Sequence, residues 1–458
     1  MRTESWRRWV VGLIMATAPL DVFAQATPPA MARAAAVPPG PAPIADLLRE
    51  PAALANWLAA HSLDAGAAAA RVAQAQALVG TAGLRPNLQV GVGLGGLPVG
   101  DTNPPGIGTQ SSLNYGLNIA QQFEIGKRSL RIAAADLRLS SQRHALTDAL
   151  GGSLADAREA IGRVLYLKSR QAALQEGLDT ARQILDLQRT RFERGDLSGN
   201  DLDRLQLDTQ VLEADLAQSR ADYADSLAAC ASVLFAPCDP GSADLAALAA
   251  PAPPAEALAA ADLDARLADR PDVLALQTLA RASEQDEALA NKRKVPDPIV
   301  GAGYLRDRFV ISGNNPRTVG LTVTLPLATS DRGQYDAARA RAERTELQAT
   351  SDAVLARGRN DATALRARHA TLSATLDTLR SDALARADAI LQSTSDAVTQ
   401  GELSTTDLLL ARRARTEVAL KAMDLEFQIF LTGNQLRQVL GLDVPLLRSV
   451  QDATWPSK

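Results

Sequence analysis

The sequence has few aromatic residues, few histidines and no long apolar run. Phe, Trp and Tyr together make up 3% of its 458 residues, although 46% of the residues are hydrophobic. A composition dominated by Ala, Leu, Arg, Asp and Gln suits long helices packed side by side better than a compact, aromatic-rich core. No segment of the mature chain approaches the ~20 apolar residues that a transmembrane helix needs.

The chain also lacks an excess of basic residues and a recognisable catalytic group. Its formal net charge is −4, whereas a nucleic-acid surface needs a clustered basic face. His61, His144 and His369 are scattered without the paired spacing of metal ligands. No nucleophile–base pair or carboxylate pair stands out. We therefore expect a protein that is not an enzyme and that has no cofactor, no metal site and no nucleic-acid partner.

The two cysteines, Cys230 and Cys238, lie close together where a helical segment runs out at Pro237. In an oxidising compartment they are expected to form a local disulfide. In the chain-entropy model a loop this short stabilises by roughly 2.5 kcal/mol. The alternative is a pair of inert thiols.

The first residues have the pattern of an export signal. A start with three arginines precedes a short apolar run, Val10–Leu20, and a small-residue cleavage site at Ala24–Ala26. This order predicts a secretory signal peptide over residues 1–26, with an ordinary amphipathic start as the alternative. Residues 27–44 are rich in Pro and Ala and are expected to be a flexible leader.

One pattern, Gly-acid-Leu-Ser followed by two variable residues, Asp and Leu, occurs twice. Its members are Gly195, Asp196, Leu197, Ser198, Asp201 and Leu202, and then Gly401, Glu402, Leu403, Ser404, Asp407 and Leu408. A glycine after a helix-favouring run can end the helix in the left-handed conformation. The serine and aspartate have the spacing of a capping box, and the leucines that of a hydrophobic staple. Each stretch therefore predicts the tip of an αα-hairpin, with the aspartate as a helix cap.

The acids beside the two glycines have two interpretations. Asp196 and Glu402 could form an acidic ring that admits cations and hinders anions. They could equally be placed there because a negative charge before a helix N-terminus is favourable.

Four segments alternate between apolar and small or polar residues with period two. These segments are 87–97, 112–123, 299–311 and 318–327. Alternation over about ten residues is what a transmembrane β-strand needs, and a half-buried soluble hairpin shows the same pattern. The membrane interpretation is favoured because the second face carries Gly, Asn, Gln and Thr, not charges. In the third segment Arg306, Asp307 and Arg308 break the alternation and are placed beyond the apolar band.

Long helical segments without proline follow each strand pair, over residues 127–193 and 331–399, and each would reach roughly 100 Å. Coiled-coil spacing is found at Leu174, Leu178, Ala181, Leu185, Gln188 and Phe192, and it continues at Leu202, Leu205, Thr209, Leu212 and Leu216. The return helices are expected over 199–235 and 405–441.

This order predicts two structural repeats. The expected divisions are a first repeat over 45–238, a linker over 239–269, a second repeat over 270–442 that opens with a helix over 271–294, and a C-terminal tail over 443–458.

Four strands cannot close a membrane barrel, because unpaired edges would face lipid. Three copies supply twelve strands, an even number that leaves an open lumen. The fold class predicted is an α+β membrane protein with an internal two-fold repeat. Its trimeric, twelve-stranded outer-membrane β-barrel would continue into a periplasmic α-helical coiled-coil barrel, and a tube of this kind implies transport.

Several ordered motifs resemble the TolC-like outer-membrane efflux family over most of residues 45–442. They are Leu84-Arg-Pro-Asn-Leu88 and Lys294-Val-Pro-Asp-Pro298 before the strands, Phe123-Glu-Ile-Gly-Lys-Arg128 and Leu325-Pro-Leu-Ala-Thr-Ser-Asp-Arg-Gly333 after them, Ala268-Asp-Arg-Pro-Asp-Val273 at the second half, and the two tips. The segments after the strands are most similar to the cobalt–zinc–cadmium branch.

The resemblance implies the outer-membrane component of a tripartite pump that exports substrates, heavy-metal cations above all, across the outer membrane. Its implied partners are an inner-membrane transporter of the RND type and a periplasmic adaptor that contacts the tips. A duct for drugs or for type I secretion is the alternative within transport. A soluble periplasmic coiled-coil scaffold or adaptor is the alternative from another class.

Overall fold

The computed structural model describes residues 40–97, 101, 105, 112–249, 252–253, 262–308, 316–400 and 402–455. The expected signal peptide and most of the expected leader lie outside these residues, and so does Gly401.

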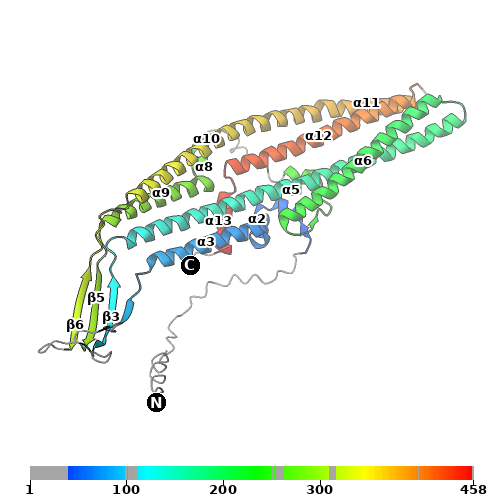
Figure 1. Ribbon diagram of the computed structural model, residues 1–458. Helices are drawn as coiled ribbons and strands as arrows, with labels where there is room; N and C mark the ends of the chain where they lie inside the picture. Colours follow the sequence, from blue (N-terminus) through cyan, green and yellow to red (C-terminus); the bar gives the residue numbers. More distant parts are fainter. Residues whose placement is uncertain are drawn as a thin grey trace, which may run out of the picture. The chain divides into compact units, whose positions relative to one another are not determined.

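The described chain consists of long helices with a small antiparallel sheet at one end of them (Figure 1). In chain order the elements are β1 (Ala42–Pro43), α1 (Ile44–Arg49), α2 (Pro51–His61), α3 (Leu63–Gly83), β2 (Gln89–Gly95), β3 (Asn114–Gln122), α5 (Arg128–Glu193), α6 (Gly199–Leu234), β4 (Cys238–Asp239), η1 (Leu245–Ala249), α8 (Leu263–Ala268), α9 (Pro271–Asn291), η2 (Lys292–Lys294), β5 (Ile299–Asp307), β6 (Arg317–Thr324), α10 (Gln334–Thr378), η3 (Leu379–Leu384), α11 (Ala385–Thr399), α12 (Thr405–Val439) and α13 (Val444–Thr454). Each hairpin, β2–β3 and β5–β6, is followed by a long helix and a return helix.

The sheet has the strand order β2-β3-β5-β6, with every neighbouring pair antiparallel. Directly opposed residues of antiparallel strands lie on the same face, so the register defines two faces. The first, which we call the apolar face, carries Val90, Val92, Leu94, Tyr115, Leu117, Ile119, Val300, Ala302, Tyr304, Val319, Leu321 and Val323.

The opposite face of the sheet is lined mainly by glycine, asparagine and threonine. Gly91 lies opposite Asn118, and a Cβ added to Gly91 would meet Asn118 Oδ1 at 2.2 Å. Gly301 lies opposite Thr322 in the same way, with 2.7 Å to Oγ1. The glycines leave room for the polar side chains of the neighbouring strand to lie across them, which explains why small and polar residues alternate on this face.

The long helices pack against one another through the apolar residues that have coiled-coil spacing in the sequence. α5 spans 66 residues, roughly 100 Å at 1.5 Å per residue, and it packs against α3, α9, α6 and α12. The expected seam is buried from Leu174 to Gln188 on α5, and it continues at Leu202, Leu205, Thr209 and Leu216 on α6. Phe192 departs from the seam, being 44% exposed, because it stands on the last turn of α5 where the chain already turns toward α6.

The second long helix is not α-helical throughout. Residues 334–399 form a continuous helical rod, but Leu379–Leu384 within it adopt a π-helical turn. Such turns are rare and widen the helix locally.

The largest apolar core surrounds the middle of α5. The end of the expected leader takes part in it, because Ala42 and Ile44 are fully buried and β1 pairs with β4. The expected C-terminal tail also contains ordered structure. Its helix α13 directs Leu447 and Val450 into this core, and Val444 is also buried. The spacing of three residues places all of them on one side of a helix.

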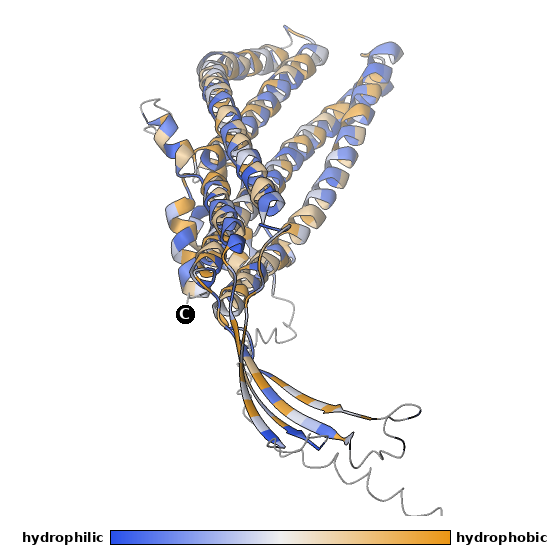
Figure 2. Cartoon of the chain, turned by 60° about the vertical axis from the view of Figure 1, so that its left-hand side comes forward, coloured by the Kyte–Doolittle hydropathy of each residue, from blue (hydrophilic) through white to orange (hydrophobic). Residues whose placement is uncertain are grey.

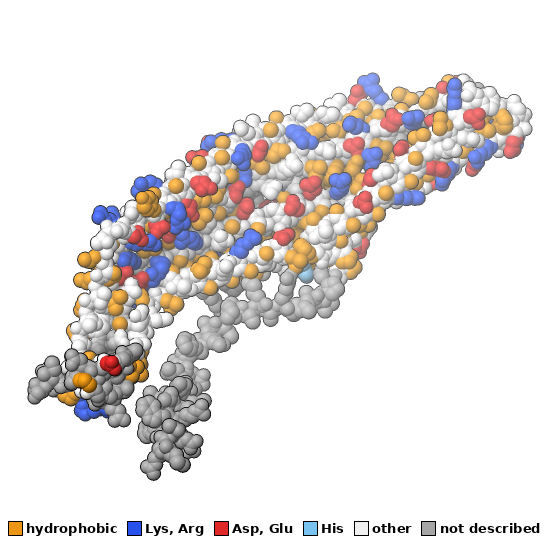
Figure 3. All heavy atoms as spheres, in the orientation of Figure 1, with side chains coloured by type: hydrophobic (Ala, Val, Ile, Leu, Met, Phe, Trp, Pro, Cys, Tyr) orange, Lys and Arg blue, Asp and Glu red, His pale blue; other side chains and the backbone are white. Residues whose placement is uncertain are grey.

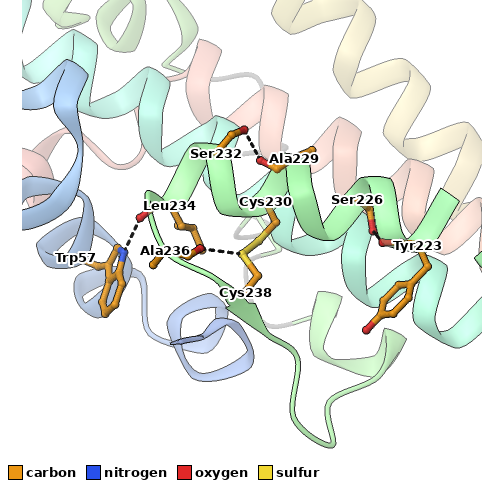
Figure 4. Close-up of a disulfide and its surroundings, with 9 residues drawn as sticks. All are labelled: Trp57, Tyr223, Ser226, Ala229, Cys230, Ser232, Leu234, Ala236 and Cys238. Atoms are coloured by element: carbon orange, nitrogen blue, oxygen red, sulfur yellow. Dashed lines mark hydrogen bonds between the residues drawn. A yellow bond between two sulfur atoms is a disulfide. The ribbon is translucent and has the colours of Figure 1, made fainter. Parts of the chain in front are cut away.

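Cys230 and Cys238 are joined by a disulfide, with Cα atoms 6.2 Å apart (Figure 4). The bond fixes the last turns of α6 to β4. Beside it, Trp57 Nε1 donates a hydrogen bond to the Leu234 carbonyl at 3.1 Å. Together these links hold the end of the first return helix against α2.

Within the described ranges, no helix combines the length and the apolar composition needed to cross a bilayer.

Candidate functional site

The first tip, between α5 and α6, closes through backbone hydrogen bonds. Gly195 has φ +83°, and its N–H donates to the Phe192 carbonyl at 2.9 Å. Asp196 N–H donates to the Arg191 carbonyl at 2.9 Å, which satisfies carbonyls left over at the helix end. Residues with a Cβ rarely adopt such a φ, so glycine is required at this position.

The return helix of this tip begins at a serine cap. Ser198 Oγ accepts a hydrogen bond from Asp201 N–H at 3.2 Å and donates to Asp201 Oδ2 at 2.7 Å. Leu197 packs against a small core that includes Leu202, which are the two positions of a hydrophobic staple.

The second tip, between α11 and α12, has a complete capping box. Ser404 Oγ accepts from Asp407 N–H at 3.2 Å, and Ser404 N–H donates to Asp407 Oδ2 at 3.1 Å. Ser404 Oγ also donates to Asp407 Oδ2 at 2.6 Å. The two bonds to this carboxylate, the side-chain one first and then the backbone one, lower the pKa of Asp407. Leu403 is exposed, in contrast to Leu197. Glu402 N–H donates to the Ala397 carbonyl at 2.9 Å.

Both tips lie at the end of the helices remote from the sheet (Figures 1 and 2). Asp196 and Glu402 are exposed there. Two exposed carboxylates at one end of the helices can attract cations or meet basic groups of a docking protein.

A cavity of about 910 Å³ separates the two helix hairpins below the tips. Arg413 on α12 reaches Asp208 on α6 at 3.5 Å, and Arg415 on α12 reaches Asp388 on α11 at 3.0 Å. Arg412 Nε is buried beside them and has no hydrogen-bond partner among the described residues. Of these ion pairs, only Arg413–Asp208 joins the two hairpins. Leu409 and Leu420 of α12 also pack against small leucine clusters of α5 and α6, so apolar contacts and an exposed ion pair hold the hairpins together.

At the other end of the helices, motifs far apart in the sequence meet where the strands begin and end; we call this region the sheet–helix junction. Lys127 Nζ lies 2.7 Å from Asp297 Oδ2, and Asp297 Oδ1 accepts from Ile125 N–H at 3.1 Å. Glu124 binds Arg131 through both oxygens, at 2.6 and 3.0 Å. The segment before β5 and the segment after β3 are thus held together by partly buried charges.

The sheet–helix junction also contains a position that requires glycine. Gly333, just before α10, has φ +73°, and a Cβ there would lie 2.1 Å from the Ala290 carbonyl oxygen. Asp331 Oδ1 accepts from Gly333 N–H at 2.9 Å. The motif Asp-Arg-Gly therefore lets the chain leave the sheet region close against α9.

The apolar face of the sheet is open to the surroundings. Val92, Leu94, Val319 and Leu321 are each more than two thirds exposed, and Figure 2 shows hydrophobic residues alternating along the strands. A surface of this kind is unfavourable in water.

Two sets of contacts between distant segments could not be predicted from the sequence. Tyr166 on α5 donates a hydrogen bond to Asp424 Oδ1 on α12 at 2.5 Å, and Arg170 reaches the same oxygen at 3.2 Å. Burial, followed by the bond to Asp424, raises the pKa of Tyr166. At the far end of the sheet, Arg306 lies over the Tyr115 ring. Pairs that join distant segments leave no local signal in the sequence.

The three histidines do not come together. His61 stacks on Trp57, and burial lowers the pKa of His144 and of His369. In the described part of the chain, no group of three or more His, Cys, Asp or Glu residues is placed to hold a metal ion.

The chain is similar to one family model and to several solved structures. Residues 54–233 match the model of a family described as "Outer membrane efflux protein". The solved structure of the outer-membrane channel OprN is 16% identical, with 88% of this chain and 93% of that chain covered and a TM-score of 0.69. CusC, studied for its folding and transmembrane channel formation, is 14% identical, with 86% and 91% covered and a TM-score of 0.68.

The outer membrane protein VceC of Vibrio cholerae is 19% identical, with 87% of this chain and 96% of that chain covered and a TM-score of 0.66. No curated protein matches the chain in sequence. At these identities the likeness establishes that the chain shares the fold of outer-membrane channels, over nearly their whole length.

Proposed function

We propose that this chain is an outer membrane efflux protein that assembles as a trimer and forms the exit duct of a tripartite efflux system. The observation that carries the proposal is the exposed apolar face of the four-stranded sheet, backed by a face of Gly, Asn and Thr. Lipid on one side and an aqueous lumen on the other accommodate such a sheet. The family match and the shared fold support the same assignment.

The edges of the sheet support the proposed trimer. β2 and β6 are its outer strands, and in lipid their outward backbone groups need hydrogen-bond partners. Pairing β6 of one copy with β2 of the next satisfies both edges, and three copies make a closed barrel of twelve strands. The helices would continue the barrel into the periplasm, which makes the molecule a passive conduit and not an enzyme.

The tips are proposed to contact a periplasmic adaptor that links the duct to an RND-type transporter of the inner membrane. Gly195 to Ser198 and Glu402 to Ser404 lie at the end of the helices remote from the sheet, which would face the inner membrane. Asp196 and Glu402 are exposed on these tips, so their carboxylates are accessible to basic groups of an adaptor.

For the substrate we propose heavy-metal cations, on the similarity of segments 122–128 and 326–333 to the cobalt–zinc–cadmium branch. The exposed carboxylates of Asp196 and Glu402 suit cation passage. A strain lacking the chain should lose tolerance to cadmium and zinc and regain it with the gene. Loss of tolerance to lipophilic dyes alone would identify a drug duct instead.

The test of the proposed function is the location and assembly of the mature protein. We expect it in the outer-membrane fraction, as a species that migrates as a trimer on a gel until it is strongly heated. A monomer in the soluble periplasmic fraction would overturn the duct and favour a coiled-coil scaffold.

Replacing both tip glycines, Gly195→Val with Gly401→Val, is expected to impair export while trimers still reach the outer membrane. A β-branched residue at the φ of +83° of Gly195 costs about 1–2 kcal/mol or more and distorts the turn. The measurement is metal tolerance together with the amount of heat-dissociable trimer.

The control for the tip variant is Gly199→Ala, where a Cβ would make only an ordinary 3.7 Å contact with Phe192. This variant should export normally. Full export by the double valine variant would show that adaptor binding does not depend on the shape of the tips.

A further inference from the structure

Basic residues outnumber acidic ones at the sheet–helix junction, although the chain as a whole has a net charge of −4. Eight Lys and Arg residues and four Asp and Glu residues lie in the segments that form the junction, residues 82–88, 123–131, 290–298 and 325–336. Arg128 Nε donates to the Gly83 carbonyl at 2.7 Å. Lys127 Nζ donates to the Val295 carbonyl at 2.9 Å. Figure 3 shows blue Lys and Arg side chains where the helices meet the sheet, and orange and white along the strands next to them.

The acids of these four segments are all neutralised by three of the bases. The ion pairs are Arg131 with Glu124, Lys127 with Asp297, and Arg293 with both Asp331 and Asp336. Within the described ranges the other five bases form no ion pair with an acid. We call them the junction bases; they are Arg85, Arg128, Lys292, Lys294 and Arg332.

The junction bases are all exposed and make few hydrogen bonds. Arg128 and Arg332 each donate to a backbone carbonyl. The side chains of Arg85, Lys292 and Lys294 donate to none of the residues that the structure describes. Like charges gathered at one end of the helices repel one another, so a negatively charged partner would stabilise this surface.

Exposed apolar and aromatic residues are interleaved with the junction bases. Phe123 is 53% exposed and Tyr335 is 83% exposed. Leu84, Ile125 and Leu327 in the same segments are exposed as well. Exposed apolar residues gathered in this way are unfavourable in water, whereas aromatic residues together with Lys and Arg are typical of the boundary between lipid and water. The composition of the junction therefore fits contact with lipid head groups.

The position of the junction along the strands agrees with such a boundary. Exposed apolar residues alternate from Val319 on β6 to Leu327 beyond its end. Eight residues separate these two, roughly 26 Å of extended chain, which is close to the ~25 Å height of the apolar band of a membrane barrel. Arg332 and Tyr335 follow directly after Leu327. The junction bases therefore lie at the end of the band that is nearest to the helices.

From this arrangement we propose that the junction bases bind anionic phospholipid head groups in the leaflet on the helix side of the membrane. The inference rests on the proposed membrane barrel. Three copies would carry these bases around the barrel, and the acyl chains of the bound lipids would lie along the apolar face. Each Lys or Arg near an anionic leaflet strengthens binding about fivefold. The junction thus selects phospholipids with a net negative charge over phospholipids without one.

The test uses the full mature trimer in detergent and two lipids with identical acyl chains, anionic dimyristoyl phosphatidylglycerol and uncharged dimyristoyl phosphatidylcholine. Native mass spectrometry measures how much of each lipid is retained. Wild type should retain the anionic lipid preferentially, and the preference should weaken as the ammonium acetate concentration rises, because exposed charges are screened. Lys292→Gln with Lys294→Gln should raise the apparent Kd of the anionic lipid by at least about tenfold.

Two further variants separate the charge at the junction from the net charge of the chain. Lys292→Arg with Lys294→Arg keeps both charges and should retain the anionic lipid as wild type does. The matched control, Arg182→Gln with Arg386→Gln, removes two exposed arginines from α5 and α11 and should also leave retention unchanged. Equal loss in this control would mean that net charge alone selects the lipid, and would overturn the site.

The remaining outcomes distinguish this inference from the proposed function. A wild-type trimer that assembles normally but retains both lipids equally refutes the inference only, whereas failure to form a membrane trimer refutes the proposed duct. If Lys292→Gln with Lys294→Gln alters the cation preference of the trimer's current in a planar bilayer but not its lipid retention, the bases line the lumen and the inference is wrong.

Discussion

Leu321→Arg is expected to abolish assembly in the outer membrane, whereas Gly320→Arg, one residue earlier, is expected to leave it intact. Leu321 lies in the middle of the apolar face and is 76% exposed. An arginine on the lipid side near the bilayer midplane costs about 2–4 kcal/mol, and a trimer carries the substitution three times. Gly320 lies on the opposite face at the same depth, and a Cβ there would meet no atom within 4 Å.

The measurement for this pair is the amount of heat-dissociable trimer in the outer-membrane fraction at equal expression. Because the two variants differ only in the face that receives the charge, loss in both would indicate that the strand tolerates no arginine at all. Normal assembly of Leu321→Arg would show that the apolar face does not contact lipid, and the sheet would have to be covered by protein.

The strands and the tips could be read from the sequence because their signals are local. Alternation with period two separates Leu321 from Thr322 without knowledge of their neighbours, and the register of β5 and β6 places them on different faces. Gly195 followed a helix-favouring run, and the structure gives it the left-handed conformation. Signals of this kind depend on backbone geometry alone.

The ion pairs of the sheet–helix junction and the helix at the end of the chain could not be predicted from the sequence. Asp297 pairs with Lys127 across 170 residues. No sequence pattern around either residue indicates which residue it will pair with. The sequence predicts a tail over residues 443–458, where the structure has helix α13, although Val444, Leu447 and Val450 have helical spacing. A stripe of three residues over less than two helical turns is too short to distinguish a packed helix from an exposed end. Phe192 continues the heptad pattern but is 44% exposed on the last turn of α5.

A buried ion pair near the end of the chain is the other feature that left no local signal. Arg158 on α5 is 2% exposed and binds both oxygens of Asp443, at 2.5 and 3.1 Å. Arg437 on α12 binds the same carboxylate at 2.6 Å. Burial alone would raise the pKa of Asp443, but the hydrogen bonds and charges of the two arginines outweigh it and hold this pKa below its usual value.

Asp443→Asn is therefore expected to lower the free energy of unfolding of the helical part by about 3–5 kcal/mol, because it leaves two arginines, one of them fully buried, without a counter-charge. Arg158→Met should cost less than half as much, since Asp443 keeps Arg437. Urea denaturation followed by circular dichroism measures both. As a control, Asp382→Asn removes an exposed helical pair with Arg386 and should cost about 0.5 kcal/mol or less.

The same ion pair predicts how the difference between wild type and Asp443→Asn depends on pH. A carboxyl whose pKa is lowered on folding contributes its full stabilisation above its unfolded pKa, roughly 3.9 for aspartate. That contribution is lost as the pH falls through the lower folded value. The difference should be constant between about pH 5 and 8 and should shrink below about pH 4, where Asp443 of the wild type becomes protonated. A difference that stays constant into strong acid would mean that the loss comes from packing and not from the charge of Asp443.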